Sequence, residues 1–266
     1  MGKKSVVIPA LLAMTVLQSC AGKPGKTYQP SSPSSATRLV QENKEDQFSL
    51  KPYLQEAAVN SSSSRDYEEA ATYWFALYQE NPSDLNAALQ SAYNMRYANS
   101  PADAVDVVND ALKTHAGNVQ LLAERGKAYA AIGNVELALQ DITIASEAAS
   151  ADWPVHSARG VILDRLNRHA EARQAYDKAL GLSPDTPVVL NNLALNQALA
   201  GRHDEAIATL QRASQRPNAN VQIRQNLSLL LAMHGDVKRA SDISQADLPH
   251  SLAKNNLDYY AGLALE

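Results

Sequence analysis

The sequence predicts an all-α solenoid of helix-turn-helix repeats, and two periodic features predict it. Six positions at intervals of 34 residues all hold alanine: Ala70, Ala104, Ala138, Ala172, Ala206 and Ala240. Twelve residues before each alanine stands another small residue: Ala58, Ala92, Gly126, Gly160, Ala194 and Ser228. Small side chains let two helices approach closely, and stacked repeats bury a continuous core that one repeat cannot bury alone. Each period therefore holds two close-packed helices.

A turn is expected between the two helices of each repeat. Five residues before each recurring alanine stand Arg65, Asn99, Gly133, Asn167, Gly201 and Gly235. Glycine in particular fits the left-handed backbone that commonly ends a helix, as we expect at Gly201. We expect about six repeats over residues 45–248 and a capping helix over residues 249–266. In the sixth repeat Asp247 takes a position that is alanine or leucine in the others, so we expect that repeat to depart from the pattern.

The N-terminal segment has the layout of a secretory signal. Lys3 and Lys4 give it a positive start, and residues 6–17 form an apolar run. A membrane-spanning helix needs about 20 apolar residues, so the run is too short to be one. The alternative is a short buried helix, although nothing amphipathic surrounds it.

The end of this segment, Leu17-Gln18-Ser19-Cys20, resembles a bacterial lipobox, and Cys20 is the one cysteine in the chain. The resemblance implies that residues 1–19 are a lipoprotein signal peptide and that Cys20 carries the lipid. Two or more acyl chains give a stable membrane anchor. Residues 20–44, rich in proline and serine, then form a flexible tether. Ala21 follows the cysteine in place of aspartate, which favours the outer membrane, with the body of the protein on its periplasmic face.

Composition and motifs argue against several classes of function. The net charge is −4 and the sequence has no basic block, so nucleic acid is not expected as a partner. His169 and His203 are 34 residues apart, and equivalent positions in neighbouring repeats lie about 10 Å apart, too far to share a metal ion. No phosphate-binding loop or catalytic motif is present. We therefore expect no enzymatic activity, no cofactor and no metal.

The repeat pattern of residues 51–248 resembles the tetratricopeptide repeat, in which the first helix of each repeat lines a concave groove. The resemblance implies that this groove is the place where a partner binds. On the first helices, the candidate positions are Tyr93, Arg96, Tyr97, Lys127, Asn191, Asn192, Gln225 and Asn226. Tyrosine offers apolar area with a polar tip, which suits it to an interface.

The asparagines allow two interpretations. Asn192 and Asn226 are equivalent residues one repeat apart, and in some members of this superfamily an asparagine ladder holds a peptide backbone through its amides. Alternatively, the amides cap or brace neighbouring helices. The sequence favours neither interpretation over the other.

The C-terminal third carries a closer resemblance, to the TadD lipoproteins of tight-adherence (Flp) pilus systems. Its marks are Arg159-Gly160, Leu163-Asp164, Leu190-Asn191-Asn192-Leu193-Ala194-Leu195, Arg224-Gln225-Asn226-Leu227 and Asp247-Leu248-Pro249. This resemblance implies an outer-membrane-anchored assembly factor, or pilotin, whose partner is the secretin of the pilus system. The alternative is a general periplasmic repeat scaffold that organises other envelope proteins.

Overall fold

The computed structural model describes residues 51–263, which form the helices α3 to α15 and no strand. The first helices of the repeats are α3 (Lys51–Ser64), α5 (Leu85–Tyr97), α7 (Val119–Ala131), α9 (Trp153–Arg165), α11 (Pro187–Leu199) and α13 (Val221–Met233). The second helices are α4 (Tyr67–Glu80), α6 (Pro101–Thr114), α8 (Val135–Ala148), α10 (His169–Leu182), α12 (His203–Ser214) and α14 (Val237–Asp247). Each helix begins 34 residues after its counterpart in the preceding repeat, and the predicted all-α solenoid of about six repeats is confirmed.

The turn inside each repeat is left-handed at the predicted position. The φ angles there are 64° at Arg65, 64° at Asn99, 89° at Gly133, 57° at Asn167, 75° at Gly201 and 93° at Gly235. Just after some of these turns an aspartate caps the second helix; the Asp66 side chain accepts a hydrogen bond from the backbone N–H of Glu69. The turn residue therefore ends one helix directly before the next begins.

The recurring small residues lie where the helices touch. All six recurring alanines are fully buried, from Ala70 to Ala240. At Gly160, an added Cβ would lie 2.7 Å from Cδ1 of the Tyr176 ring, so even alanine is too large there. The small residues thus allow the close helix contacts that the sequence pattern predicts.

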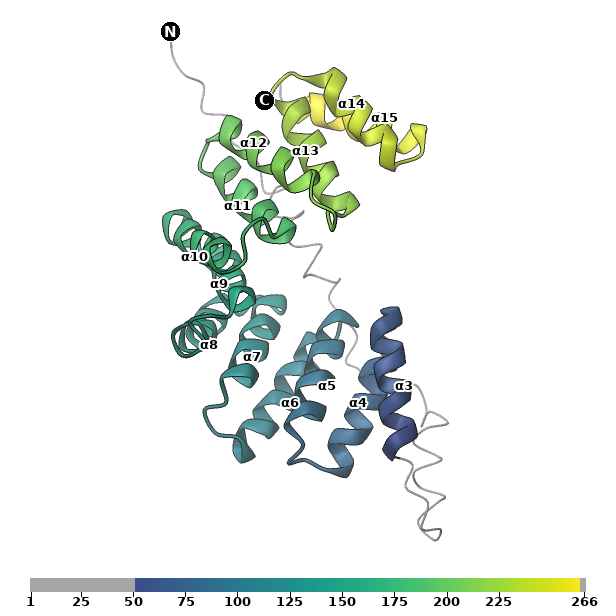
Figure 1. The fold of residues 1–266 in the computed structure, drawn as a ribbon, viewed down its shortest axis with the longest axis vertical. Helices are drawn as coiled ribbons and strands as arrows, with labels where there is room; N and C mark the ends of the chain where they lie inside the picture. Colours follow the sequence, from purple (N-terminus) through teal and green to yellow (C-terminus); the bar gives the residue numbers. More distant parts are fainter. Residues whose placement is uncertain (1–50, 264–266) are drawn as a thin grey trace. The chain divides into compact units, whose positions relative to one another are not determined.

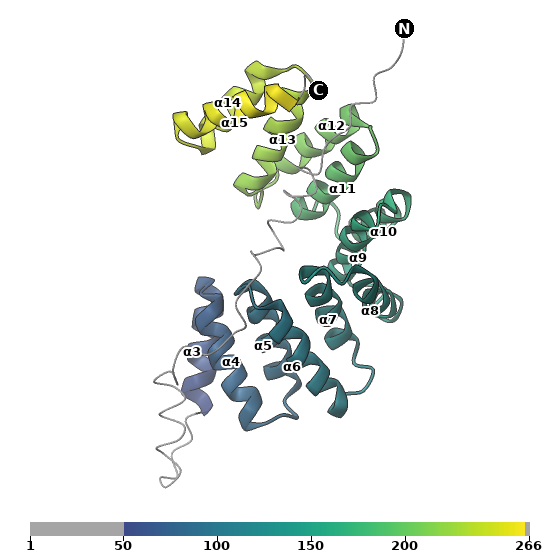
Figure 2. The same ribbon diagram turned by 180° about the vertical axis from the view of Figure 1, so that it is seen from behind.

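The described helices form two compact units. The N-terminal unit contains α3 to α8, and the C-terminal unit contains α9 to α15. Within each unit, successive helices pack against one another, as Figure 1 shows and as Figure 2 shows from behind. Buried leucine, isoleucine and alanine side chains fill the C-terminal unit, while Trp74, Tyr78 and Met95 join the core of the N-terminal unit.

The last helix, α15 (His250–Leu263), packs against α13 and α14, and its Ala253 is fully buried. No helix within residues 51–263 is long and apolar enough to cross a membrane. Cys20, the predicted signal peptide and the predicted tether over residues 20–44 lie outside the described residues.

Candidate partner-binding surfaces

Three tyrosines form an aromatic surface on the N-terminal unit, here called the tyrosine surface: Tyr67 on α4, with Tyr93 and Tyr97 on α5. The rings of Tyr67 and Tyr97 stack with their centroids 4.9 Å apart, and those of Tyr93 and Tyr97 are 4.7 Å apart. Tyr67 and Tyr93 meet edge to face at 6.5 Å. Tyr93 is 37% exposed and Tyr97 is 43% exposed, so the packed rings still present area to solvent.

Arg96 contacts the tyrosine rings and connects them to Glu124 on α7. Its guanidinium carbon lies 4.5 Å from the ring centroid of Tyr97 and 5.5 Å from that of Tyr93, within the range of cation–π attraction. Its Nε donates to Oε1 of Glu124 on α7 at 2.7 Å, and the two side chains are only 6% and 7% exposed. The charge of Arg96 is therefore buried against Glu124, and Arg96 fixes the tyrosine rings.

Glu124 is shared with Lys127, whose Nζ lies 3.3 Å from Oε2 of Glu124. Burial by itself raises the pKa of Glu124, but the nearby charges of Arg96 and Lys127 outweigh it and hold the pKa below its usual range. The carboxylate is therefore charged at neutral pH and links α5 to α7. The Lys127 side chain is partly exposed, one repeat after the position of Tyr93.

In the C-terminal unit, the candidate asparagines differ in their roles. Asn191 and Asn226 brace neighbouring helices, whereas Asn192 is half-buried. Nδ2 of Asn226 donates to Oδ1 of Asn191 at 2.8 Å, and Oδ1 of Asn226 accepts from Nε2 of Gln222 at 2.9 Å. Asn226 is only 2% exposed. The amides of Asn191 and Asn226 thus join α11 to α13, which favours the bracing interpretation for Asn226. Asn192 is half-buried, and its Oδ1 accepts from Nδ2 of Asn191 at 3.3 Å.

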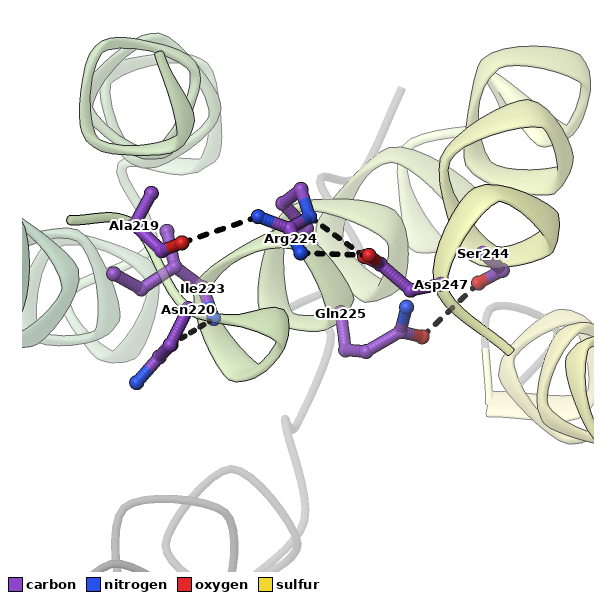
Figure 3. A network of polar contacts seen from close by, with 7 residues as sticks. All are labelled: Ala219, Asn220, Ile223, Arg224, Gln225, Ser244 and Asp247. Atoms are coloured by element: carbon purple, nitrogen blue, oxygen red, sulfur yellow. Dashed lines mark hydrogen bonds and ion pairs between the residues drawn. The ribbon is translucent and has the colours of Figure 1, made fainter. Parts of the chain in front are cut away.

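Gln225 belongs to a second polar contact, between α13 and α14 (Figure 3). Its Oε1 accepts from the hydroxyl of Ser244 at 3.2 Å. Beside it, Arg224 makes two hydrogen bonds with the carboxylate of Asp247, at 2.7 and 2.6 Å, and a third with the carbonyl oxygen of Ala219 at 3.2 Å. The structure thus places Gln225 next to a structural ion pair, and it does not bring the C-terminal amides into one row.

The comparisons with known proteins agree with this geometry. Residues 142–187 and 158–221 match the tetratricopeptide repeat family. TTC0263, a thermophilic repeat protein of this kind from Thermus thermophilus, superimposes with a TM-score of 0.62 at 22% identity. The match covers 68% of this chain and 98% of TTC0263. Residues 51–263 have the fold of a tetratricopeptide-repeat solenoid.

Two further likenesses concern the fold or a part of the chain. The MamA RS-1 ArsTM double mutant superimposes with a TM-score of 0.52 at 17% identity, over 64% of this chain and 96% of that one. The uncharacterized protein y4yS of Sinorhizobium fredii (strain NBRC 101917 / NGR234) is 31% identical over 98 residues, which are 37% of this chain and 54% of that relative. The chain thus spans about half the length of this relative.

Asp164 is the centre of a polar network, a role that the sequence pattern does not predict. Its carboxylate accepts from the Tyr176 hydroxyl at 2.9 Å and from Nδ2 of Asn196 at 2.7 Å, and lies 2.9 Å from Nδ1 of His169. Burial raises the pKa of Asp164, although these hydrogen bonds act in the opposite direction. The network joins α9, α10 and α11. Within residues 51–263, no group of three or more His, Cys, Asp or Glu residues could hold a metal ion.

The marks that carry the resemblance to TadD have structural roles in this tetratricopeptide-repeat solenoid. Gly160 receives the Tyr176 ring, Asp164 is the centre of the polar network, and Asn191 pairs with Asn226. Arg224 pairs with Asp247. The tetratricopeptide-repeat fold is typically a non-catalytic scaffold that binds segments of other proteins. Tyr67 was missed as a site residue; the available signal was an aromatic side chain that opens the second helix of the first repeat, directly before the repeat that carries Tyr93 and Tyr97.

Proposed function

We propose that this chain is a scaffold lipoprotein that captures a segment of an envelope protein through the tyrosine surface. The observation that carries the proposal is the geometry of Tyr67, Tyr93 and Tyr97, whose packed rings remain partly exposed while Arg96 fixes them from within. Rings already held in place lose little rotamer freedom when a partner binds. Tyrosine is also among the residues that most often supply the binding energy of an interface.

The site of action in this proposal is the periplasmic face of the outer membrane. The support is the charged start, the apolar run and the lipobox-like end at Cys20, with no other cysteine in the chain. The test is metabolic labelling with a fatty acid. The wild type should incorporate the label, whereas Cys20→Ser should not and should accumulate as an unprocessed precursor. Equal labelling of both proteins would contradict the anchor.

The partner in this proposal is the secretin of a tight-adherence pilus system, with the chain acting as its assembly factor. The support is the resemblance of the C-terminal third to TadD. The repeat fold by itself supports the coarser function, a general scaffold for envelope proteins. Capture from envelope extracts, with mass spectrometry of the bound proteins, separates the two: the secretin should be the main bound protein if the chain is its assembly factor.

The test of the surface is the double change Tyr93→Ala with Tyr97→Ala. Losing a true interface anchor costs more than about 1 kcal/mol, so secretin capture should fall at least about fivefold. The control is Ile144→Ala, which removes an apolar side chain of 51% exposure on α8, outside the tyrosine surface. Circular dichroism should show that both variants stay helical. Undiminished capture by the folded tyrosine variant would show that the partner binds elsewhere.

A further inference from the structure

We propose that the chain's own segment Pro30-Ser31-Ser32-Pro33 occupies the tyrosine surface when no partner is bound. The inference rests on the proposed function, since it treats the same surface as a binding site. It adds a regulatory element, because the partner must displace this segment. The segment precedes the described residues, and its chemistry, its distance along the chain and the exposed rings together identify it as the occupant.

The segment has the pattern of a polyproline II ligand. Two prolines with two residues between them match the period of this helix, which has three residues per turn, so a segment in that conformation would place both rings along one edge. Polyproline II has no internal hydrogen bonds and is already extended, so docking costs little conformational entropy. Grooves that recognise such segments are lined by aromatic side chains. Tyr67, Tyr93 and Tyr97 form such an aromatic surface among the described residues.

The spacing of the surface also suits the segment. Val59 and Lys127 occupy the register position of Tyr93 in the preceding and following first helices, and Val59 is 47% exposed. The first helices α5 and α7 pack against each other, and packed helices lie about 8–10 Å apart. Three residues of polyproline II span about 9 Å, so Pro30 and Pro33 can lie over successive first helices. One proline then faces the tyrosine rings while the other reaches the next helix.

The length of chain between the segment and the fold permits this contact. The first described helix begins at Lys51, which is 18 residues beyond Pro33, and a coil of that length spans about 23 Å on average. Tyr67 opens α4, at the far end of the 14-residue helix α3, which is about 21 Å long. A linker whose average length matches the span gives an effective concentration in the millimolar range. Even a weak proline–tyrosine contact is then well populated.

Docking would couple partner binding to the distance that the body of the protein can reach from its membrane anchor. With Pro30–Pro33 held on the tyrosine surface, only the residues between Cys20 and Pro30 separate the body from the lipidated end. A partner that displaces the segment releases the full tether of residues 20–44. The body can then move farther from the membrane only once it has bound its partner.

The test is site-specific photo-crosslinking in cells that make the full chain, with p-benzoylphenylalanine at Gln29. We expect intramolecular crosslinks to residues 93–97 or to Tyr67, and loss of most of them in Pro30→Ala with Pro33→Ala. The matched control, Ser31→Ala with Ser32→Ala, keeps both prolines and should keep the crosslinks. Crosslinks elsewhere on the chain, crosslinks to a second copy, or crosslinks to the tyrosine surface that persist without the prolines would each overturn the inference.

A second measurement separates this inference from the proposed function. The probe is a fluorescent peptide of residues 27–35, added to the purified full chain. It should bind the Pro30→Ala, Pro33→Ala chain several-fold more tightly than the wild type, and it should not bind when Tyr93→Ala and Tyr97→Ala are also present. If the peptide binds neither chain while the tyrosine variant still loses secretin capture, the inference fails and the proposed function stands. If the peptide and crosslink results hold while capture is unaffected, the tyrosine surface serves the tether alone.

Discussion

Arg224 and Asp247 form a two-pronged ion pair, with Nε 2.7 Å from Oδ2 and Nη2 2.6 Å from Oδ1. Asp247 stands where earlier repeats carry Leu77, Ala111, Ala145, Ala179 and Ala213, all of them buried. The sequence pattern departs at this position, as expected, and the structure supplies the reason. A charge replaces the small residue, and Arg224 on the neighbouring helix compensates for it.

Replacing the charge tests this pair. Asp247→Asn should lower the free energy of unfolding by about 1–2 kcal/mol at pH 7, because hydrogen bonds to charged groups contribute on that scale. The pKa of Asp247 is lowered by its hydrogen bonds with Arg224. A lowered carboxyl pKa contributes stability above the pKa of the unfolded chain, about 3.9, and that contribution is lost as the pH falls through the folded value. Urea unfolding should therefore show a smaller difference at low pH than at pH 7.

The matched control is Asp242→Asn, an exposed carboxylate on the same helix. It should leave the unfolding free energy nearly unchanged at both pH values, since exposed surface charges contribute little. An equal loss in both variants, or a loss in Asp247→Asn that is no smaller at low pH, would contradict a role for the ion pair.

Gly160→Ala tests the close approach of α9 and α10. The added Cβ would lie 2.7 Å from Cδ1 of Tyr176, whose ring is buried and whose hydroxyl is bound to Asp164, so the ring cannot move freely. Overpacking of this kind typically costs about 1–3 kcal/mol. Gly181→Ala on α10 is the matched control: apart from its chain neighbours and the nearby backbone of its own helix, no atom lies within 4 Å of its Cβ position, so alanine should stabilise the helix by about 0.5–1 kcal/mol. Thermal melts in which both changes have the same sign would be incompatible with this packing.

Asn226→Ala tests the amide brace. Removing a buried side chain that bonds to Asn191 and Gln222 leaves partners unsatisfied, so the expected loss is about 1–2 kcal/mol. Asn192→Ala, at a half-buried position, should change the melting temperature little. If Asn226→Ala melts like the wild type and instead weakens partner capture, the peptide-ladder interpretation would be restored.

The regular parts of the fold could be predicted because each depends on one residue at a fixed interval. A left-handed turn needs glycine or a tolerant residue, as at Gly201, and a close helix contact needs a small one, as at Ala206. The polar contacts do not follow a fixed residue interval. Arg96 reaches Glu124 across 28 residues, and Asn226 reaches Asn191 across 35 residues instead of the 34 of the repeat. These pairings depend on side-chain direction, which the periodic pattern does not determine.

The division into two units was equally invisible in the sequence. The spacing continues without insertion across residues 150 and 151, where the units divide, so the pattern shows no boundary. The tyrosine surface could be predicted from the sequence only in part. Tyr93 and Tyr97 could be placed on one helix face from their spacing of four residues, whereas the burial of Arg96 beneath them required the position of Glu124 on the next repeat.

The tyrosine surface should be visible in an alkaline titration. Burial, together with the neighbouring rings of Tyr97 and Tyr67, raises the pKa of Tyr93 to about 12, while the charge of Arg96 lowers it slightly. In a chain labelled at the tyrosine ζ carbon, the resonance of Tyr93 should therefore titrate well above pH 10, the ordinary value. Tyr93→Phe identifies the resonance by its disappearance, and Tyr53→Phe, which removes a tyrosine of 59% exposure, should leave it in place.

The same shift predicts how stability responds to pH. A tyrosine whose folded pKa lies above its unfolded value of about 10 contributes stability that is fully present below pH 10 and is lost as the pH rises through about 12. The melting temperature of the wild type should therefore fall more steeply than that of Tyr93→Phe over this range. Arg96→Gln removes the one nearby charge that lowers this pKa, and it also leaves the buried Glu124 without its closest partner, so it should destabilise the chain already at pH 7. A Tyr93 resonance that titrates near pH 10 would show that the three rings do not pack together in solution, and both proposals for this surface would then lose their structural basis.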